Sequence, residues 1–344
     1  IEMKALYFEE HGDLNVIQYG DVADPSAGPD DVVVRVRACA LNHLDIWVRR
    51  GWPGLKLDMP HWCGADVAGE IVDVGRNVTG WRVGQAVIVD PGISLAADEY
   101  TRRGEDSLSP GYHVIGEHTR GGAAEYLAVP AANLAAKPDG LEFPAGAAPL
   151  LVSLTAWRML IHRARLRAGE TVLVVGSGGG VNSMAIQIAK LAGARVYAVA
   201  GNRLKAEKAR ELGADVALDR SKVDWSREIY RLTDKRGVDV VVDNVGQATI
   251  NQSMLAVARG GRVVIVGNTS GPTAQIDMRY IFGKQISLIG STMGSHQDFR
   301  DIVKLVCTGR LKPVIDRILP LREGKAAYGL MERGEMFGKV VLTP

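Results

Sequence analysis

The chain has 344 residues, of which 41 are Lys or Arg and 39 are Asp or Glu, so its formal net charge at pH 7 is +2. This length suffices for two domains, and the near balance of charge argues against a nucleic-acid or membrane partner. The cysteines, Cys39, Cys63 and Cys307, are far apart and show no CxxC spacing. They argue against a disulfide scaffold, and we expect a reducing, cytoplasmic location.

The sequence does not lead us to expect a membrane span or an N-terminal signal peptide. We find no apolar run long enough to span a bilayer and no signal peptide at the N-terminus. We expect Ile1 and Glu2 to be cloning remnants ahead of a natural start at Met3.

The first 150 residues have the pattern of half-buried strands. Between Asp31 and Cys39, valines alternate with polar residues, as in a strand with one wet face. Similar short strands are predicted at Ala68–Val74 and Gln85–Val89, separated by glycine-rich turns. This part is therefore predicted to be a mostly antiparallel β domain.

The pattern changes near Ser153, where short apolar runs begin to alternate with helical segments. Such runs indicate strands buried on both faces of a doubly wound parallel sheet. The predicted strands are Thr171–Val175, Arg195–Ala200, Val238–Val242 and Arg262–Val266, and the helical segments are Met184–Leu191 and Asn202–Leu212.

The tail after Ser291 is expected to return to the first domain. It contains a helix-like segment, Phe299–Thr308, then Pro313–Pro320 and a closing strand, Gly338–Leu342. The predicted domains are residues 1–152 with 292–344, and residues 153–291.

A glycine-rich turn follows the first buried strand. Glycines at this place allow the backbone to approach a pyrophosphate at the N-terminus of the next helix. A tight turn without a ligand is the alternative, but the strand–turn–helix–strand unit favours a dinucleotide. The predicted contacts are Ser177, Gly178, Gly179, Gly180 and Val181.

The end of the second buried strand bears on the choice of cofactor. An acidic residue there usually bonds the ribose of NAD, and none is present. Arg or Lys nearby can pair with the 2′-phosphate of NADP, so NADPH is favoured over NADH. Solvated helix residues are the alternative. The predicted contacts are Gly201, Asn202, Arg203, Lys205 and Arg220.

Several motifs in one order resemble the zinc-free quinone oxidoreductase branch of the medium-chain dehydrogenase/reductase superfamily. They are LNHLDIWVRRG (41–51), CGADVAGEIVDVG (63–75), GGAAEY (121–126), LTAW (154–157), AIQIAKLAGA (185–194) and FGKVVL (337–342). The resemblance implies an α/β chain with a GroES-like N-terminal domain and a Rossmann domain. It also matches Lys205 to an NADPH-contacting lysine and places Asn182 where the last glycine of the family's loop would fall.

The same resemblance implies that the usual zinc ligands are missing. In zinc alcohol dehydrogenases the catalytic metal is held by a Cys in C-H-x-D, a His in G-H-E and a later Cys. The matching residues here are Asn42, Ala65 and Leu151, none of which is a zinc ligand. The structural zinc lobe of those enzymes has four cysteines, and the matching residues are Leu95, Asp98, Thr101 and Ser109.

A relocated metal site is the alternative. His43, Asp45, His61, Cys63 and Asp66 are ligand-capable types that lie close in sequence. Lone His and Cys residues are more often structural, so no metal site is predicted.

Without a Lewis acid, reduction of an electrophilic carbonyl is easier than oxidation of an alcohol. The predicted catalytic residues are Asn42, which would face the nicotinamide or the substrate oxygen, Asp45, which would orient its neighbours, and Trp47, which would line a flat pocket. Thr155 resembles a residue that abuts the nicotinamide. Each also has a structural alternative: a turn cap for Asn42, core packing for Trp47, and for Thr155 a bond to its own helix backbone.

Loops after two later strands are also predicted to contact the cofactor, because the carboxyl ends of parallel strands border the ligand crevice. The residues are Asn244, Val245, Val266, Gly267 and Asn268.

Three functions remain open. The favoured one is a zinc-independent NADPH reductase of quinones or α,β-unsaturated carbonyls. The others are an alcohol dehydrogenase with an unconventional or absent zinc site and a non-catalytic nucleotide-binding protein. Relatives suggest a homodimer or homotetramer, with 285–292 as a plausible edge strand for pairing.

Overall fold

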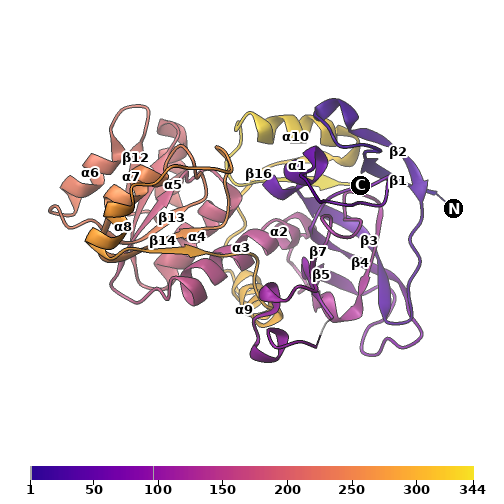
Figure 1. Cartoon of the computed structure of the whole chain (residues 1–344). Coiled ribbons are helices and arrows are strands. Elements are labelled where there is room, and N and C mark those ends of the chain that lie inside the picture. The colour runs from indigo at the N-terminus through magenta and orange to yellow at the C-terminus, as the bar shows by residue number, and fades with distance from the viewer. Residues whose placement is uncertain (1, 96) are drawn as a thin grey trace. The chain divides into compact units, whose positions relative to one another are not determined.

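The computed structural model describes residues 2–95 and 97–344, and the chain divides into two compact units (Figure 1). Unit 1 contains the residues up to Leu151 and those from Gly294 to Pro344, and unit 2 contains Val152–Met293. The boundaries predicted from the sequence lie within two residues of these. Ile1, expected to be a cloning remnant, lies outside the described residues.

Unit 2 is built on a six-stranded sheet with the order β12–β11–β10–β13–β14–β15, in which all neighbouring strands run parallel. The strands are β10 (Thr171–Val175), β11 (Arg195–Ala200), β12 (Val216–Asp219), β13 (Val238–Asp243), β14 (Val257–Ile265) and β15 (Ser287–Gly290). The helices are α3 (Leu150–Trp157), which begins just before the boundary and continues as a π-helical turn (Arg158–Arg163), α4 (Gly180–Leu191), α5 (Arg203–Glu211), α6 (Trp225–Leu232), α7 (Ile250–Ala256) and α8 (Met278–Lys284). The first strand lies near the middle and the chain winds outward in both directions, which confirms the predicted Rossmann fold.

Local sequence explains these elements. The central strands are rich in β-branched residues and buried on both faces, as parallel strands between helices require. Helix α4 begins at Gly180, four residues before the predicted Met184, because the glycine turn itself supplies its first residues. The predicted edge segment contains β15, which pairs only with β14 in the described sheet.

Unit 1 contains a seven-stranded sheet with the order β16–β17–β3–β4–β5–β9, and β8 also pairs with β3. Its strands are β3 (Asp31–Ala40), β4 (Asp66–Val74), β5 (Ala86–Val89), β8 (Tyr126–Pro130), β9 (Leu134–Ala136), β16 (Ile315–Pro320) and β17 (Lys339–Thr343). Two small sheets pair β1 (Glu2–Tyr7) with β2 (Gln18–Ala23) and β6 (Gly92–Ser94) with β7 (Tyr112–Val114). The helices are α1 (His43–Arg50), α2 (Phe143–Ala147), α9 (His296–Cys307) and α10 (Gly324–Glu332), with short 3-10 turns between elements.

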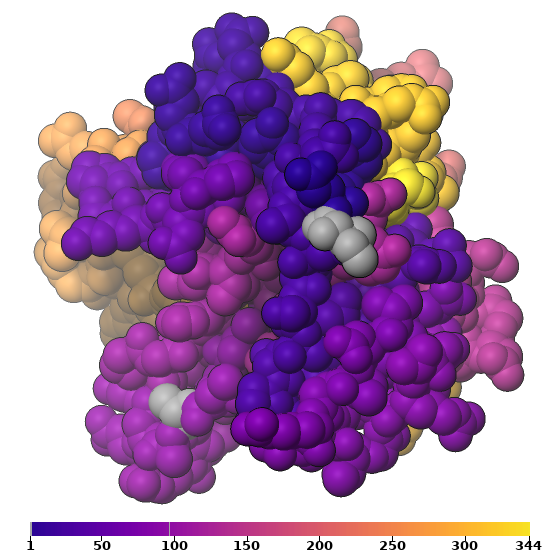
Figure 2. All heavy atoms as spheres, turned by 90° about the vertical axis from the view of Figure 1, so that its right-hand side faces the viewer, coloured from indigo at the N-terminus to yellow at the C-terminus, as the bar shows by residue number. Residues whose placement is uncertain are grey.

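The pairings of unit 1 confirm the predicted mostly antiparallel domain and the return of the tail. In the described part of this sheet, the strand pairs are antiparallel except β16 with β17. The last strand, β17, lies between β16 and β3, so residues from both ends of the chain share one sheet. Figure 2 shows C-terminal residues, in yellow, beside N-terminal residues, in indigo, on the same face.

One sequence expectation is wrong. The helical run Phe143–Arg163 is long and apolar enough, by length and composition alone, to cross a membrane. However, 78% of its apolar window is buried inside the protein, so its hydrophobicity is explained by core packing.

Candidate functional site

Three buried side chains form a closed ring of hydrogen bonds in unit 1. The Lys339 ammonium donates to Asp66 Oδ2 at 2.8 Å and also to Asn42 Oδ1. Asn42 Nδ2 donates to the same Asp66 oxygen at 3.0 Å. Their relative exposures are 6% for Asn42, 3% for Lys339 and 0% for Asp66. Asn42 is therefore the member of the ring most open to a ligand.

Strand register brings these residues together. Ala40 on β3 pairs with Asp66 on β4 on one side and with Val341 on β17 on the other. Lys339 is two residues before Val341, and Asn42 is two residues after Ala40. The end of β3 thus lies beside the first residues of β4 and β17, although Asp66 and Lys339 are 273 residues apart in sequence.

The ring fixes the orientation of the Asn42 amide. Its oxygen faces a cation and its nitrogen faces a carboxylate, so the reverse orientation would break both bonds. The other oxygen of Asp66 accepts from the backbone N–H of Leu151 at 2.7 Å. Two donors have no assigned partner within this ring: one N–H of the Asn42 amide and one N–H of the ammonium.

Asp45 holds the backbone around the ring, as predicted. Its carboxylate accepts from the N–H of Asn42 at 2.7 Å and from the N–H of Gly64 at 3.1 Å. Burial raises the pKa of Asp45 to about 6, despite these bonds and the nearby Lys339 charge. Gly64 has φ of +101°, and a Cβ there would lie 2.5 Å from the sulfur of Cys39, so only glycine fits.

The alternatives for Asn42 and Trp47 are partly resolved. Asn42 occupies the N-cap position of α1, but its side chain is committed to Lys339 and Asp66. Trp47 is half-buried, and its ring meets that of His43 edge-on with centroids 6.1 Å apart. Trp47 therefore keeps a free part of its surface, as a pocket residue would.

In unit 2, the glycine turn lies where β10 ends and α4 begins. Gly176 has φ of +81°, and a Cβ there would lie 2.9 Å from Val245. A Cβ at Gly178 would lie 3.0 Å from the Lys205 side chain, so this lysine reaches over the turn. Gly178, Gly179, Gly180 and Val181 are all partly accessible. The turn thus provides a bare backbone, a twelve-residue helix N-terminus and a nearby lysine, which fits a pyrophosphate.

Asn182 explains the departure from the family's glycine pattern. Its amide donates to the carbonyls of Val175 and Gly176, both at 2.8 Å, and its oxygen accepts from Asn244 Nδ2 at 2.8 Å. Asn244 Oδ1 in turn accepts from the N–H of Val266. The side chain of Asn244, predicted to contact the cofactor, is instead used to tie the three loops together.

The predicted residues at the end of β11 divide into two groups. Asn202 caps α5 by accepting from the N–H of Lys205 at 2.9 Å, and Arg203 pairs with Glu207 on its own helix at 2.8 Å. For Arg203 this supports the solvated-helix alternative. Arg220 is exposed, and its guanidinium lies about 4 Å from where a Cβ at Gly201 would be. Arg220 and Lys205 are therefore the better placed cations.

Two buried hydroxyls bear on the remaining predictions. The Thr155 and Ser177 hydroxyls have no hydrogen-bond partner in the described part of the chain. For Thr155 the alternative of a bond to its own helix is therefore wrong, and a cofactor amide would satisfy the oxygen. Ser177 is 0% exposed and its hydroxyl is equally unsatisfied, so its cofactor contact stays a prediction. Val245, Val266, Gly267 and Asn268 are partly accessible, as loop contacts require.

Comparisons with known proteins agree with this architecture. Residues 28–139 match the family described as alcohol dehydrogenase GroES-like domain, and residues 180–308 match the family described as zinc-binding dehydrogenase. An NAD-dependent alcohol dehydrogenase of Saccharolobus solfataricus is 33% identical over 99% of this chain and 100% of its own length. The chain belongs to the medium-chain dehydrogenase/reductase superfamily.

Other members of the superfamily show the range of activities among its relatives. An acryloyl-coenzyme A reductase of Metallosphaera sedula is 33% identical, covering 99% of this chain and 100% of its own length. A human quinone oxidoreductase is 29% identical, covering 99% and 97%. A solved NAD-dependent alcohol dehydrogenase superposes with a TM-score of 0.96 at 42% identity, covering 99% of this chain and 100% of its own. This medium-chain dehydrogenase/reductase is thus an oxidoreductase of a family that binds nicotinamide cofactors.

The ligand-capable residues of this dehydrogenase/reductase do not assemble into a metal site. Among the described residues, no three His, Cys, Asp or Glu side chains converge as ligands. His61 bonds the carbonyl of Gly116 at 3.1 Å, Cys63 contacts the carbonyl of Asp45, and Asp66 belongs to the ring. These three side chains thus have other partners in the described part of the chain, and the absence of a metal site stays a prediction.

The loop matching the structural zinc lobe is held by hydrogen bonds. Asp98 accepts from Ser109 Oγ at 2.5 Å and from the N–H of Thr101 at 2.9 Å. Thr101 Oγ1 accepts from the N–H of Asp98 at 3.0 Å. Three of the four residues at the expected cysteine positions thus contact one another, whereas Leu95 is exposed.

Sequence reasoning missed Lys339. The closing strand was recognised, but not the role of its first residue. A charged residue at the start of an otherwise apolar strand was the available signal, because a buried lysine needs a partner.

Proposed function

We propose that this oxidoreductase is a zinc-independent, NADPH-dependent reductase that transfers hydride to a quinone or an α,β-unsaturated carbonyl. The observation that carries the proposal is the ring of Lys339, Asn42 and Asp66. Asn42 stands where zinc alcohol dehydrogenases have a cysteine ligand, and its oxygen is already bonded to an ammonium. A divalent cation bound to that oxygen would meet the lysine charge at close range, which strongly disfavours it.

The residues of the ring fit the needs of such a reduction. When bound, the reduced nicotinamide supplies the hydride, and negative charge then develops on the substrate oxygen. The remaining N–H of Asn42 would donate to that oxygen, while the neighbouring ammonium polarises the amide and offsets the charge. Asp66 keeps both donors aligned, and Asp45 holds the backbone N–H of Asn42. The proton that completes the product comes from water.

We further propose NADPH rather than NADH as the preferred cofactor. The support is local: the end of β11 and the turn after it read Ala200-Gly201-Asn202 without an acid, and Arg220 and Lys205 lie beside this turn. A 2′-phosphate would pair with these cations, whereas the ribose diol of NADH finds no carboxylate in this turn. The ratio of kcat/KM values for NADPH and NADH tests this directly.

Alcohol dehydrogenation is the second candidate. It is favoured by the solved relative named an NAD-dependent alcohol dehydrogenase, which is 42% identical. In this chain that reaction would need a base for the hydroxyl proton, and the carboxylate of the ring, Asp66, is already bonded to Lys339, Asn42 and the N–H of Leu151. We rank it below the reductase because no ligand set for a Lewis acid is assembled from the described residues.

The decisive experiment combines metal analysis with turnover. Protein purified without added chelator or zinc is analysed for bound zinc and is assayed with NADPH and NADH against 1,4-benzoquinone and a crotonyl thioester and, in the reverse direction, with NADP⁺ and NAD⁺ against a small alcohol. We expect turnover of the quinone or the thioester and less than one zinc in ten chains. Stoichiometric zinc together with activity only on the alcohol would overturn the proposal.

A matched pair of variants assigns the role of Asn42. Asn42→Ala removes the proposed donor and is expected to lower kcat by about 100-fold, the usual effect of one oxyanion donor. Asn251→Ala removes an exposed amide that bonds only the Gln275 carbonyl, and should leave kcat unchanged. Equal rates for the two variants would contradict the assignment of Asn42.

For the assembly and location we propose a cytoplasmic homodimer paired through β15. The supporting observations are the free edge of the described sheet at β15 and three cysteines without a disulfide. Sedimentation at micromolar concentration tests the dimer, and a mass equal to one chain would contradict it.

A further inference from the structure

A polar hollow of about 480 Å³ opens in unit 2, away from the glycine turn. It lies where the π-helical turn after α3 leads into β10, and strands β14 and β15 form its other wall. The charged residues of its lining are Arg163, Arg165, Arg167, Arg262 and Glu170. Four guanidinium groups and one carboxylate thus border a single hollow in a chain whose total charge is nearly balanced.

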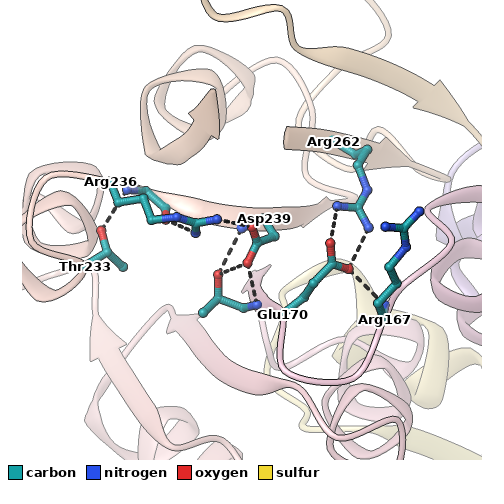
Figure 3. Close-up of polar contacts among 8 residues, drawn as sticks. Arg167, Glu170, Thr233, Arg236, Asp239 and Arg262 are labelled. Carbon is teal, nitrogen blue, oxygen red and sulfur yellow. Dashed lines mark hydrogen bonds and ion pairs between the residues drawn. The ribbon is translucent and has the colours of Figure 1, made fainter. Parts of the chain in front are cut away.

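The single carboxylate is fully engaged. Glu170 accepts from both terminal nitrogens of Arg262 at 2.8 Å and from the N–H of Arg167 at 2.9 Å (Figure 3). These bonds, led by Arg262, lower the pKa of Glu170, so it stays ionised and committed to Arg262. The other acid labelled in Figure 3, Asp239, accepts hydrogen bonds from the guanidinium of Arg236 and from the hydroxyl of Thr171. Neither acid is available to the other arginines.

Two arginine side chains are left without a partner. Within residues 2–95 and 97–344, neither Arg165 nor Arg167 has a side-chain hydrogen bond or ion pair, and both are exposed. In Figure 3 the guanidinium of Arg167 carries no contact. Arg163 donates one hydrogen bond, from its Nε to the carbonyl of Gly290. Elsewhere in unit 2, exposed arginines are commonly matched with an acid, as Arg227 is with Asp224 and Arg231 with Glu228.

The backbone that presents these arginines is held in place. Arg262 donates from Nε to the carbonyl of Ala164 at 2.9 Å and contacts the carbonyl of Arg165. Arg165 has φ of +51°, a left-handed conformation that is unfavourable for a residue with a side chain. The rigid support and the strained residue both indicate that the direction of these side chains matters.

The hollow is separate from the cofactor turn. Glu170 immediately precedes β10, whereas Gly176 immediately follows it. Five residues of extended strand span roughly 17 Å, so a ligand at one end leaves the other end open. Pairs of guanidinium groups match the geometry of phosphate oxygens, and a volume of this size accommodates a small molecule.

We propose that this hollow binds a small phosphate-bearing molecule through the guanidinium groups of Arg163, Arg165 and Arg167, independently of the nicotinamide cofactor. Arg262 and Glu170 act as the scaffold that holds the arginines and do not themselves bind the ligand. The proposal does not depend on which substrate the enzyme reduces.

The test uses inorganic pyrophosphate and isothermal titration calorimetry. The full-length protein is first saturated with NADPH, so that the glycine turn is occupied. We expect one pyrophosphate site per chain whose affinity falls at least tenfold in the double variant Arg165→Gln/Arg167→Gln. The matched control, Arg227→Gln/Arg231→Gln on α6, removes two exposed charges from the same unit and should bind pyrophosphate as the unaltered protein does. Thermal unfolding verifies that both double variants are folded.

Three outcomes would overturn the proposal. One is the absence of pyrophosphate binding to the NADPH-saturated protein. Another is an equal loss in both double variants, which would reveal a general charge effect. The third is binding of duplex DNA or anionic vesicles, but not of pyrophosphate, in a manner that depends on Arg165 and Arg167, because the surface would then serve a macromolecule.

Discussion

Replacing Lys339 with methionine tests whether the ammonium is what holds the ring together. The substitution keeps an unbranched side chain that is one heavy atom shorter, and it removes the charge. At 2.8 Å and an effective dielectric constant of about 20, the attraction between Lys339 and Asp66 is roughly 6 kcal/mol before desolvation is subtracted. Removing one partner of a buried pair leaves the other charge uncompensated and typically costs about 3–5 kcal/mol. Asp66 keeps only the N–H of Leu151 and the amide of Asn42 as partners.

The assay is urea unfolding of four proteins: the unaltered chain, Lys339→Met, Asp66→Asn and the double variant. We expect Lys339→Met to lower the free energy of unfolding by about 3–5 kcal/mol, or the melting temperature of this 344-residue chain by about 4–7 °C. The double variant should be more stable than Lys339→Met alone, because no buried charge is left unpaired. The control is Lys190→Met, which breaks a half-exposed pair with Asp215 and should cost less than about 1 kcal/mol. A cost for Lys339→Met no larger than that of the control, or a coupling near zero in the cycle, would refute the reasoning.

Three further predictions concern other parts of the chain. Burial raises the pKa of Asp45 to about 6 from an ordinary value of 3.8, so the folded state binds the proton more tightly and this residue's contribution to stability is lost as the pH rises through about 6. In urea unfolding, Asp45→Asn should therefore cost more at pH 4 than at pH 7, by up to about 3 kcal/mol. A cost that is the same at both pH values would contradict this. Asn182→Gly restores the family's glycine but breaks three hydrogen bonds, so it should destabilise unit 2 by about 1–3 kcal/mol and weaken the binding of NADPH measured by fluorescence. Stronger binding of NADPH would show that the asparagine side chain only obstructs the cofactor. The bond to Asp90 raises the pKa of His296, so the stability that this pair contributes is present below pH 6.5 and lost at higher pH. The destabilisation caused by His296→Ala should therefore be smaller at pH 9 than at pH 6. An equal loss of stability at the two pH values would show that the effect comes from packing.

The sequence predicted the architecture well because its signals are local. Alternation in β3 and the buried runs of β10 and β13 depend only on which face of a strand meets the core. Helix α4 was predicted too short because glycines suggest a turn, although here Gly179 caps the helix and Gly180 begins it. The run 143–163 shows the converse, since apolar composition alone does not distinguish a core helix from a membrane span.

The site was predicted less completely because its contacts are distant in sequence. Asn42 and Asp45 were found through the motif that contains them. Lys339 was missed because its partner Asp66 lies on another strand, and only the register of β17, β3 and β4 brings the two together. The roles of Asn182 and Asn244 were hidden for the same reason, since their bond joins the first turn of α4 to a loop 62 residues away in sequence. Thr155 was recognised, but the unsatisfied state of its hydroxyl is visible only in three dimensions.

The position of β17 in the middle of its sheet has a consequence for how the protein is made. Asp66 leaves the ribosome 273 residues before Lys339, which at 5–20 residues per second is an interval of roughly 14–55 s. During that time the whole of unit 2, a continuous segment, is synthesised and free to fold. Unit 1 begins first but finishes last, and until β17 arrives β3 lacks one neighbour and Asp66 lacks its cation. A nascent chain therefore presents an open strand edge beside an unpaired acid, and this interval is when unit 1 is most in need of a chaperone.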